Sequence, residues 1–292
     1  PVAAAASDQP EITLQYEHSR AMEALANAQD ARDAITAKLL RSAAAAWPDR
    51  WRELDPLPFR FASWVGYDMD GRTDIKWYTS IAFRLAEKAQ RLERYAVQLE
   101  AIDPAHSLLA QLRAAHNRTA ASAGEFAGDL SDHGDLSAAA NRLTADGDDK
   151  LLSLAPIVSK LEEEALGADE DRAAGLKTLA AAMRADGLGM GHIHFRVNAK
   201  QLHNAIRRRI DPDGNLDLAS KSAVAHLRRA ITELKPRRTN FGALAIEAST
   251  AIRQFLAMAQ ILQHIDADAP IRMLIAECEE PATVLAALYF AK

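Results

Sequence analysis

The chain has 292 residues, a hydrophobic fraction of 49% and a net charge of -5. This length suits one large domain or two ordinary ones, and the aromatic fraction of only 6% with abundant alanine favours a core of helices packed on helices. No apolar run approaches the roughly 18 residues of a membrane-spanning helix, so a membrane partner is not expected. A single cysteine, Cys278, excludes an internal disulfide and suits the cytoplasm.

The two ends of the chain predict an excerpt from a longer protein. The first residues lack the basic and long apolar regions of a signal peptide. The last residues, from Thr283 to Lys292, read as an amphipathic helix that stops without a cap. We therefore expect both ends to be cut.

The charge is unevenly distributed, because residues 200–240 contain ten lysines and arginines and only four acidic residues. Such a segment could bind phosphate, nucleic acid or an acidic partner subunit. It holds no aromatic residue on which bases could stack, so the prediction is a solvated helix face and no nucleic-acid partner.

In chain order, residues 10–46 predict one long helix that Pro48 ends. The run 59–65 has strand character and leads into a turn-rich loop at 66–71. A 3.6-residue apolar period predicts a strong helix over 77–102, in which Glu87 and Arg91 have the spacing of a favourable ion pair. Residues 104–186 continue as helices with short polar breaks.

Three glycines between 187 and 191 interrupt this helical stretch, and a strand is predicted at 192–197. Helices follow at 198–210, 216–234 and 240–267, then a third strand at 272–277 and a closing helix from Pro281. Short strands separated by large helical segments do not pair as hairpins, and they fit a parallel or barrel sheet. We therefore expect a mainly α protein with short parallel strands near 59–65, 192–197 and 272–277, and a helical insertion over 77–186. Residues 1–292 would form one helix-rich domain or part of a larger, TIM-like α/β barrel.

The strand at 192–197 is the most informative segment, because its polar and apolar residues alternate. Burying imidazoles and a guanidinium is costly unless they are paired or bind something, so the polar face predicts a barrel interior or its mouth. The alternative is an edge strand with a solvated polar face. His192 and His194 also have the spacing of a metal pair, but no third ligand is fixed nearby, so a hydrogen-bonding or proton-transfer role is favoured. The polar face consists of His192, His194, Arg196 and Asn198, and the apolar face of Ile193, Phe195 and Val197.

Carboxylates follow the first and the third predicted strand. Asp68 and Asp70 could hold Mg²⁺, cap the following helix or orient an arginine. Glu277 lies where barrel enzymes place site residues, although it could equally complement the dipole of the next helix.

Three segments together resemble a known family. Residues 63–71, Ser-Trp-Val-Gly-Tyr-Asp-Met-Asp-Gly, are similar to the Ser-Trp-x-Gly-Gly-Asp-Arg-Asp-Gly-Asn-Pro signature of bacterial-type phosphoenolpyruvate carboxylases. Residues 194–196, followed by Gln201 and His203, resemble that family's strand ending in Leu-Asp-x-Arg-Gln. Residues 275–279 and 283–292 resemble its strand before a Ser-Asp-Val-Leu helix. The chain departs from the signature at Tyr67 and Met69, where the family has glycine and arginine, and at residues 72–73, where it has Asn-Pro.

The resemblance implies an internal part, from the N-terminal half, of a carbon–carbon lyase that converts phosphoenolpyruvate and bicarbonate into oxaloacetate and phosphate. It also implies a cytoplasmic homo-oligomer and an excerpt that is inactive alone. Mg²⁺ or Mn²⁺ would be the cofactor, with its ligands outside this chain and none within it. Two alternatives stay open: a diverged relative that binds an anionic metabolite without carboxylating it, which Met69 supports, and a helical interaction scaffold. The expected catalytic residues are Arg196 and His194, and the expected substrate-binding residues are Arg196, Asp68, Asp70, Arg72 and Glu277.

Overall fold

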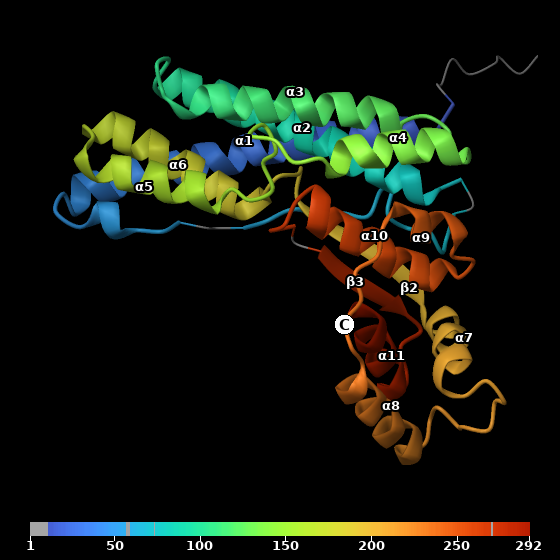
Figure 1. Cartoon of the computed structure of the whole chain (residues 1–292). Helices are drawn as coiled ribbons and strands as arrows, with labels where there is room; N and C mark the ends of the chain where they lie inside the picture. The colour runs from blue at the N-terminus through green and yellow to red at the C-terminus, as the bar shows by residue number, and fades with distance from the viewer. Residues whose placement is uncertain (1–10, 57–58, 73, 270) are drawn as a thin grey trace, which may run out of the picture.

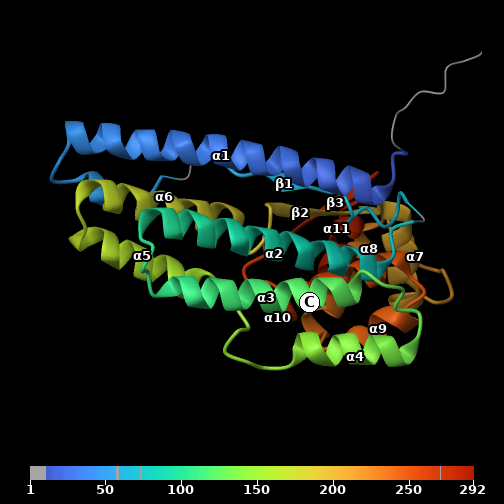
Figure 2. The same ribbon diagram turned by 90° about the horizontal axis from the view of Figure 1, so that it is seen from above.

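The computed structural model describes residues 11–56, 59–72, 74–269 and 271–292. Long helices lie side by side in an elongated bundle, and a small sheet with its own helices packs at one end of that bundle (Figures 1 and 2). The bundle contains α1 (Leu14–Ala46), α2 (Trp77–Ile102), α3 (Leu108–Phe126), α4 (His133–Thr144), α5 (Ala155–Gly167) and α6 (Glu170–Asp186), with a short 3₁₀ turn at Trp51–Glu53.

The second region is built around three strands. Its strands are β1 (Ala62–Ser63), β2 (His192–Asn198) and β3 (Ile271–Ala276), and its helices are α7 (Ala199–Ile210), α8 (Lys221–Glu233), α9 (Phe241–Ile246), α10 (Thr250–His264) and α11 (Pro281–Ala291). The strands form one parallel sheet in the order β1-β2-β3, which confirms the parallel prediction. The described residues show this three-stranded sheet and not a TIM-type barrel.

The first predicted strand exists but is much shorter than expected, because β1 pairs with β2 over two residues only. The chain turns directly after it: the Tyr67 N–H donates to the carbonyl of Trp64 at 3.0 Å, and Gly66 has a φ of +89°. Because the chain turns at residues 64–67, the backbone after Ser63 leaves the sheet. Residues 57 and 58, near its beginning, lie outside the described residues.

Most helix boundaries follow the sequence signals. The Thr13 side chain caps α1 by accepting the Tyr16 N–H at 3.2 Å, and α2 has the predicted bounds. The predicted helix over 240–267 is divided into α9 and α10, because Ser249 caps a new helix and accepts the Ile252 N–H. None of the described helices is long and apolar enough to cross a membrane.

Two networks of buried charges hold α2 in the bundle. In one, Arg84 donates to Glu87 at 3.1 Å and to Asp266 at 2.6 Å. In the other, Arg91 lies 2.8 Å from Asp186. The predicted Glu87–Arg91 pair is therefore wrong: the two side chains belong to different networks, because α2 is packed on several sides and each charge finds a partner from another element.

Candidate functional site

The carboxyl ends of β1 and β2 bring together residues that are 128 positions apart in the sequence. The Arg196 guanidinium of β2 donates to the Asp68 carboxylate at 3.3 Å. Parallel strands end at the same edge of their sheet, and this geometry places the loop after β1 beside the end of β2. The structure thus joins Arg196 and Asp68, as the predicted arginine-orienting role requires.

Hydrogen bonds anchor the loop after β1 to α2. The Ser80 hydroxyl donates to the carbonyl of Gly66 at 2.5 Å, and the buried Tyr67 hydroxyl donates to Glu87 at 2.9 Å. A Cβ at Gly66 would lie 2.3 Å from the Phe83 ring, so this close approach needs glycine. The anchoring holds Asp68 in a fixed place relative to the sheet.

Asp70 is the second carboxylate of this loop. Burial raises the pKa of Asp70 to about 6, and the hydrogen bond and repulsion from Asp68 act in the same direction, whereas Arg196 opposes them. The two carboxyls and the guanidinium therefore form one electrostatic group that can hold a proton near neutral pH.

The two faces of β2 differ as predicted, but the polar face is more open than expected. Ile193, Phe195 and Val197 are buried against the helices. The Arg196 side chain is 45% exposed, so it is not enclosed in a polar interior. β2 is nevertheless the central strand and not an edge strand, because β1 and β3 flank it.

His194 lies on this same face, one pleat before Arg196, and opposite Arg272 of β3. Burial and the positive charge of Arg272 lower the pKa of His194, so the imidazole is neutral at pH 7. Its Nε2 atom is buried, and none of the described residues gives it a hydrogen-bond partner. A neutral imidazole with a free ring nitrogen can donate or accept a proton.

Glu277 follows β3 and lies at the same edge of the sheet as the end of β2. Its carboxylate accepts a hydrogen bond from the Asn198 side chain at 3.1 Å, and so lies beside the end of β2. Its φ of +56° is the single positive value among the described non-glycine residues. Backbone conformations of this kind cost about 1–3 kcal/mol and cluster at functional sites.

Arg72 does not join this group. It donates to Asp74 at 2.7 Å and also pairs with Glu17 of α1. The expectation that Arg72 would bind substrate beside Asp68 is therefore not supported, since nearer carboxylates hold its guanidinium.

Gln254 is a contributor that the sequence interpretation missed. It is fully buried in α10, and its side-chain amide donates to the Arg196 carbonyl at 2.6 Å. An amide among the apolar positions of a predicted helix is the signal that could have identified it, because buried amides need partners. Gln254 fixes the end of β2 and so the direction in which Arg196 leaves the strand.

The described residues do not fit a magnesium site: no group of three or more histidine, cysteine or acidic side chains converges in the part of the chain that the structure describes. Asp68 faces the guanidinium of Arg196 instead. Mg²⁺ or Mn²⁺ therefore stays an expectation that the family resemblance alone supplies.

Comparisons with family models, with curated proteins and with solved structures gave no match.

Proposed function

We propose that this chain contributes to the active site of an enzyme of the phosphoenolpyruvate carboxylase type, in which phosphoenolpyruvate and bicarbonate give oxaloacetate and phosphate. The complete enzyme would be a cytoplasmic homo-oligomer whose barrel includes β1, β2 and β3. Its divalent metal ligands would come from outside this chain.

The meeting of Arg196 with Asp68 is the observation that carries this proposal. The family resemblance rests on separate segments, and it requires the arginine of the second and the aspartate of the first to share one site. They lie 3.3 Å apart at the carboxyl edge of a parallel sheet, which is where α/β enzymes bind their ligands.

The chemistry of the group suits an anionic substrate. A guanidinium binds phosphate or carboxylate oxygens through two parallel hydrogen bonds, and the partial exposure of Arg196 leaves it accessible to them. Asp68 orients the guanidinium, and cations positioned in this way stabilise the charge that develops on phosphoryl and enolate oxygens. Neutral His194 would be placed to move a proton at the same face.

A second candidate is a diverged relative that binds an anionic metabolite without carboxylating it. Met69, which stands where the family has an arginine, is buried in the apolar core with Tyr67. At position 69 this chain therefore has a buried, uncharged thioether where the family has a cation. Arg72 does not replace that cation.

The test is an assay of bicarbonate-dependent oxaloacetate formation by the complete protein that contains this chain. Arg196→Gln should lower kcat/KM by about 10²–10³-fold, the usual cost of removing one such charge-stabilising donor. Arg237→Gln, an exposed arginine in the link between α8 and α9, is the matched control and should leave the rate unchanged.

The outcomes separate the candidates. Activity in the wild type with a large loss in Arg196→Gln supports the carboxylase. No activity, combined with phosphoenolpyruvate binding that Arg196→Gln abolishes, supports the diverged relative. Absence of both activity and phosphoenolpyruvate binding in the wild type would leave a helical scaffold as the remaining interpretation, whereas activity and binding that are unchanged in Arg196→Gln would contradict the role given to Arg196.

A further inference from the structure

The face of the sheet that carries Arg196 continues onto β3. In the parallel register, His194 of β2 lies opposite Arg272 of β3, and Arg196 lies opposite Leu274. Paired residues of neighbouring strands point to the same side of a sheet, so Arg272 shares the face of Arg196 and His194. From the usual strand spacing, the Cα atoms of Arg196 and Arg272 are about 8 Å apart. Two arginines therefore lie next to His194, one further along β2 and one across on β3.

This face of β3 is open to solvent. Arg272 is exposed, and Leu274, the next residue on the same face, is 42% exposed. The alternate residues Met273 and Ile275 pack into the core on the other side of the sheet. A small molecule can therefore reach Arg272 from solvent, as it can reach Arg196.

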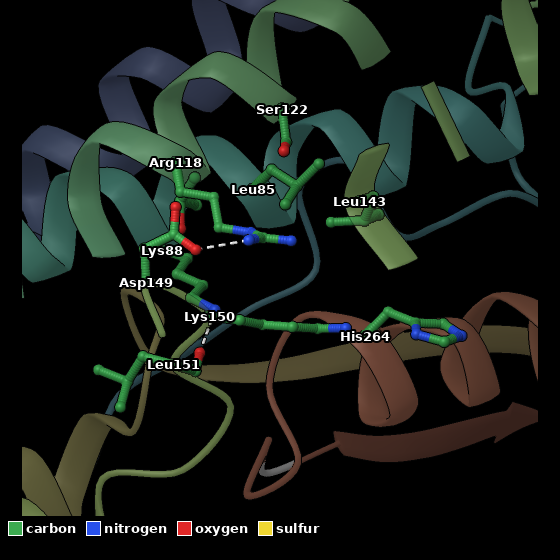
Figure 3. Close-up of a pocket in the computed structure, with 10 residues that line it drawn as sticks. Leu85, Lys88, Arg118, Ser122, Leu143, Asp149, Lys150, Leu151 and His264 are labelled. Carbon is green, nitrogen blue, oxygen red and sulfur yellow. Dashed lines mark hydrogen bonds and ion pairs between the residues drawn. The ribbon is translucent and has the colours of Figure 1, made fainter. Parts of the chain in front are cut away.

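The charge of Arg272 has no partner in the part of the chain that the structure describes: no carboxylate pairs with its guanidinium, and it donates no hydrogen bond. The cations around the small cavity among α2, α3 and α10 differ in this respect (Figure 3). There Arg118 pairs with Asp149, and Lys88 donates to two backbone carbonyls. Arg196 is also held by a carboxylate. A guanidinium has five N–H donors, so those of Arg272 are available to a ligand.

The guanidinium of Arg272 lies close enough to β2 to act on both of its histidines. Burial, and then the positive charge of Arg272, lower the pKa of His192 and of His194. The buried Nε2 atom of His194 has no hydrogen-bond partner among the described residues. The neutral ring can carry its one N–H at this atom, and an oxygen of a bound anion would accept it and remove the cost of the unpaired polar group.

We propose that Arg272 and His194 form a second anion-binding subsite beside Arg196, so that this face binds a small molecule with one phosphate and one carboxylate group. The inference rests on the proposed function, whose substrate carries both groups. Arg272 keeps its full charge and binds the phosphate, which is the more highly charged group. Asp68 partly neutralises Arg196, which binds the carboxylate, next to which the enolate oxygen forms. A guanidinium matches either group through two parallel hydrogen bonds.

Two subsites select for a ligand that fills both. A ligand with one anionic group leaves one arginine hydrated, whereas contact of the second group becomes intramolecular once the first is bound. Leu274, exposed beside Arg196, offers an apolar contact to the carbon atoms that join the two groups. Phosphoenolpyruvate should therefore bind more tightly than inorganic phosphate or pyruvate.

The experiment measures the binding of these three probes to the complete protein that contains this chain. Calorimetry measures phosphoenolpyruvate, and broadening of the ligand NMR signals measures the two weaker probes. Arg272→Gln should weaken the binding of inorganic phosphate by about 10–100-fold, the range expected for a hydrogen bond between charged groups, and should leave pyruvate unchanged. Arg196→Gln should weaken pyruvate and leave phosphate unchanged. Each substitution should weaken phosphoenolpyruvate.

Two further variants are controls. Arg272→Lys keeps the charge without the two-pronged geometry, so it should recover part of the phosphate affinity that Arg272→Gln loses. Arg237→Gln removes an exposed arginine from the link between α8 and α9 and should change no affinity. Because Arg272 is exposed, its variants should keep the unfolding midpoint of the wild type.

The outcomes distinguish this inference from the proposed function. Phosphate binding that is unchanged in Arg272→Gln overturns the second subsite, even where Arg196-dependent oxaloacetate formation supports the carboxylase. The full pattern of losses without oxaloacetate formation supports the subsite and contradicts the carboxylase. Phosphate binding that depends on Arg196 instead of Arg272 overturns the assignment of the two groups, and a wild type that binds none of the probes overturns both proposals.

Discussion

Gly189 offers a sharp test of the buried charge network on α2. A Cβ at this position would lie 1.8 Å from Nη1 and 2.2 Å from Cζ of Arg84, so the guanidinium would have to move by more than 1 Å. It has no free space to enter, because Arg84 is completely buried and is held by Glu87 at 3.1 Å and Asp266 at 2.6 Å.

Gly189→Ala should therefore act as if it broke a buried ion pair. Such a break costs about 3–5 kcal/mol, a large part of the roughly 5–15 kcal/mol by which proteins are stable. The measurement is urea-induced unfolding followed by circular dichroism. The backbone of Gly189 does not lie in the left-handed region, so strain in φ adds nothing to the expected loss.

Gly124→Ala is the matched control. Gly124 lies in the exposed face of α3, and a Cβ there meets nothing within 4 Å. Alanine should stabilise this helix by about 0.5–1 kcal/mol, so the two identical substitutions should have opposite signs. A loss below about 1 kcal/mol in Gly189→Ala would refute the reasoning, because it would mean that the guanidinium relaxes freely.

Further substitutions test other parts of the structure. Asp186→Asn should lower the free energy of unfolding by about 3–5 kcal/mol, because buried Arg32 and Arg91 both pair with Asp186; urea denaturation measures this, and a loss near zero would mean that the arginines find other partners. Asp70→Asn should change the pH dependence of stability. The pKa of Asp70 is raised to about 6 in the folded chain, so folding takes up a proton and the wild type gains stability as pH falls from about 6 towards 3.8. The variant should lack this gain in unfolding curves at pH 4.5 and 7, and identical curves would contradict the raised pKa. Gly66→Ala should cost at least about 2 kcal/mol, since it combines the clash with Phe83 and a φ of +89°; a neutral effect in thermal unfolding would argue against the fixed loop.

The helices were predictable because local signals specify them. The apolar period predicted the bounds of α2, and the alternation of residues 192–197 predicted β2 and the face that it buries. Local signals failed where a single residue decided the outcome, as with the Ser249 cap that divides the predicted last long helix.

The partners of buried charges were not predictable from spacing. The (i, i+4) distance between Glu87 and Arg91 is that of a pair on an isolated helix, yet tertiary packing brings His18 to Glu87 and Asp186 to Arg91. Asp266 is 182 positions from Arg84, and no local pattern encodes such a contact.

The candidate site was predictable only in part. The motif resemblance led to Asp68 and Arg196, which meet, and to Arg72, which neighbouring carboxylates hold instead. Gln254 was missed because its role depends on the position of α10 against β2, which only the fold determines.

The two networks on α2 have a consequence for how the chain unfolds. Arg84, Glu87, Lys88 and Arg91 occupy two successive turns, and their partners come from residues 18, 186, 265 and 266. A shift of α2 by one residue would leave buried charges of both networks without their partners at the same time. The bundle and the sheet region should therefore lose structure together, in one cooperative transition, with no stage at which the helices persist after the last strand has detached.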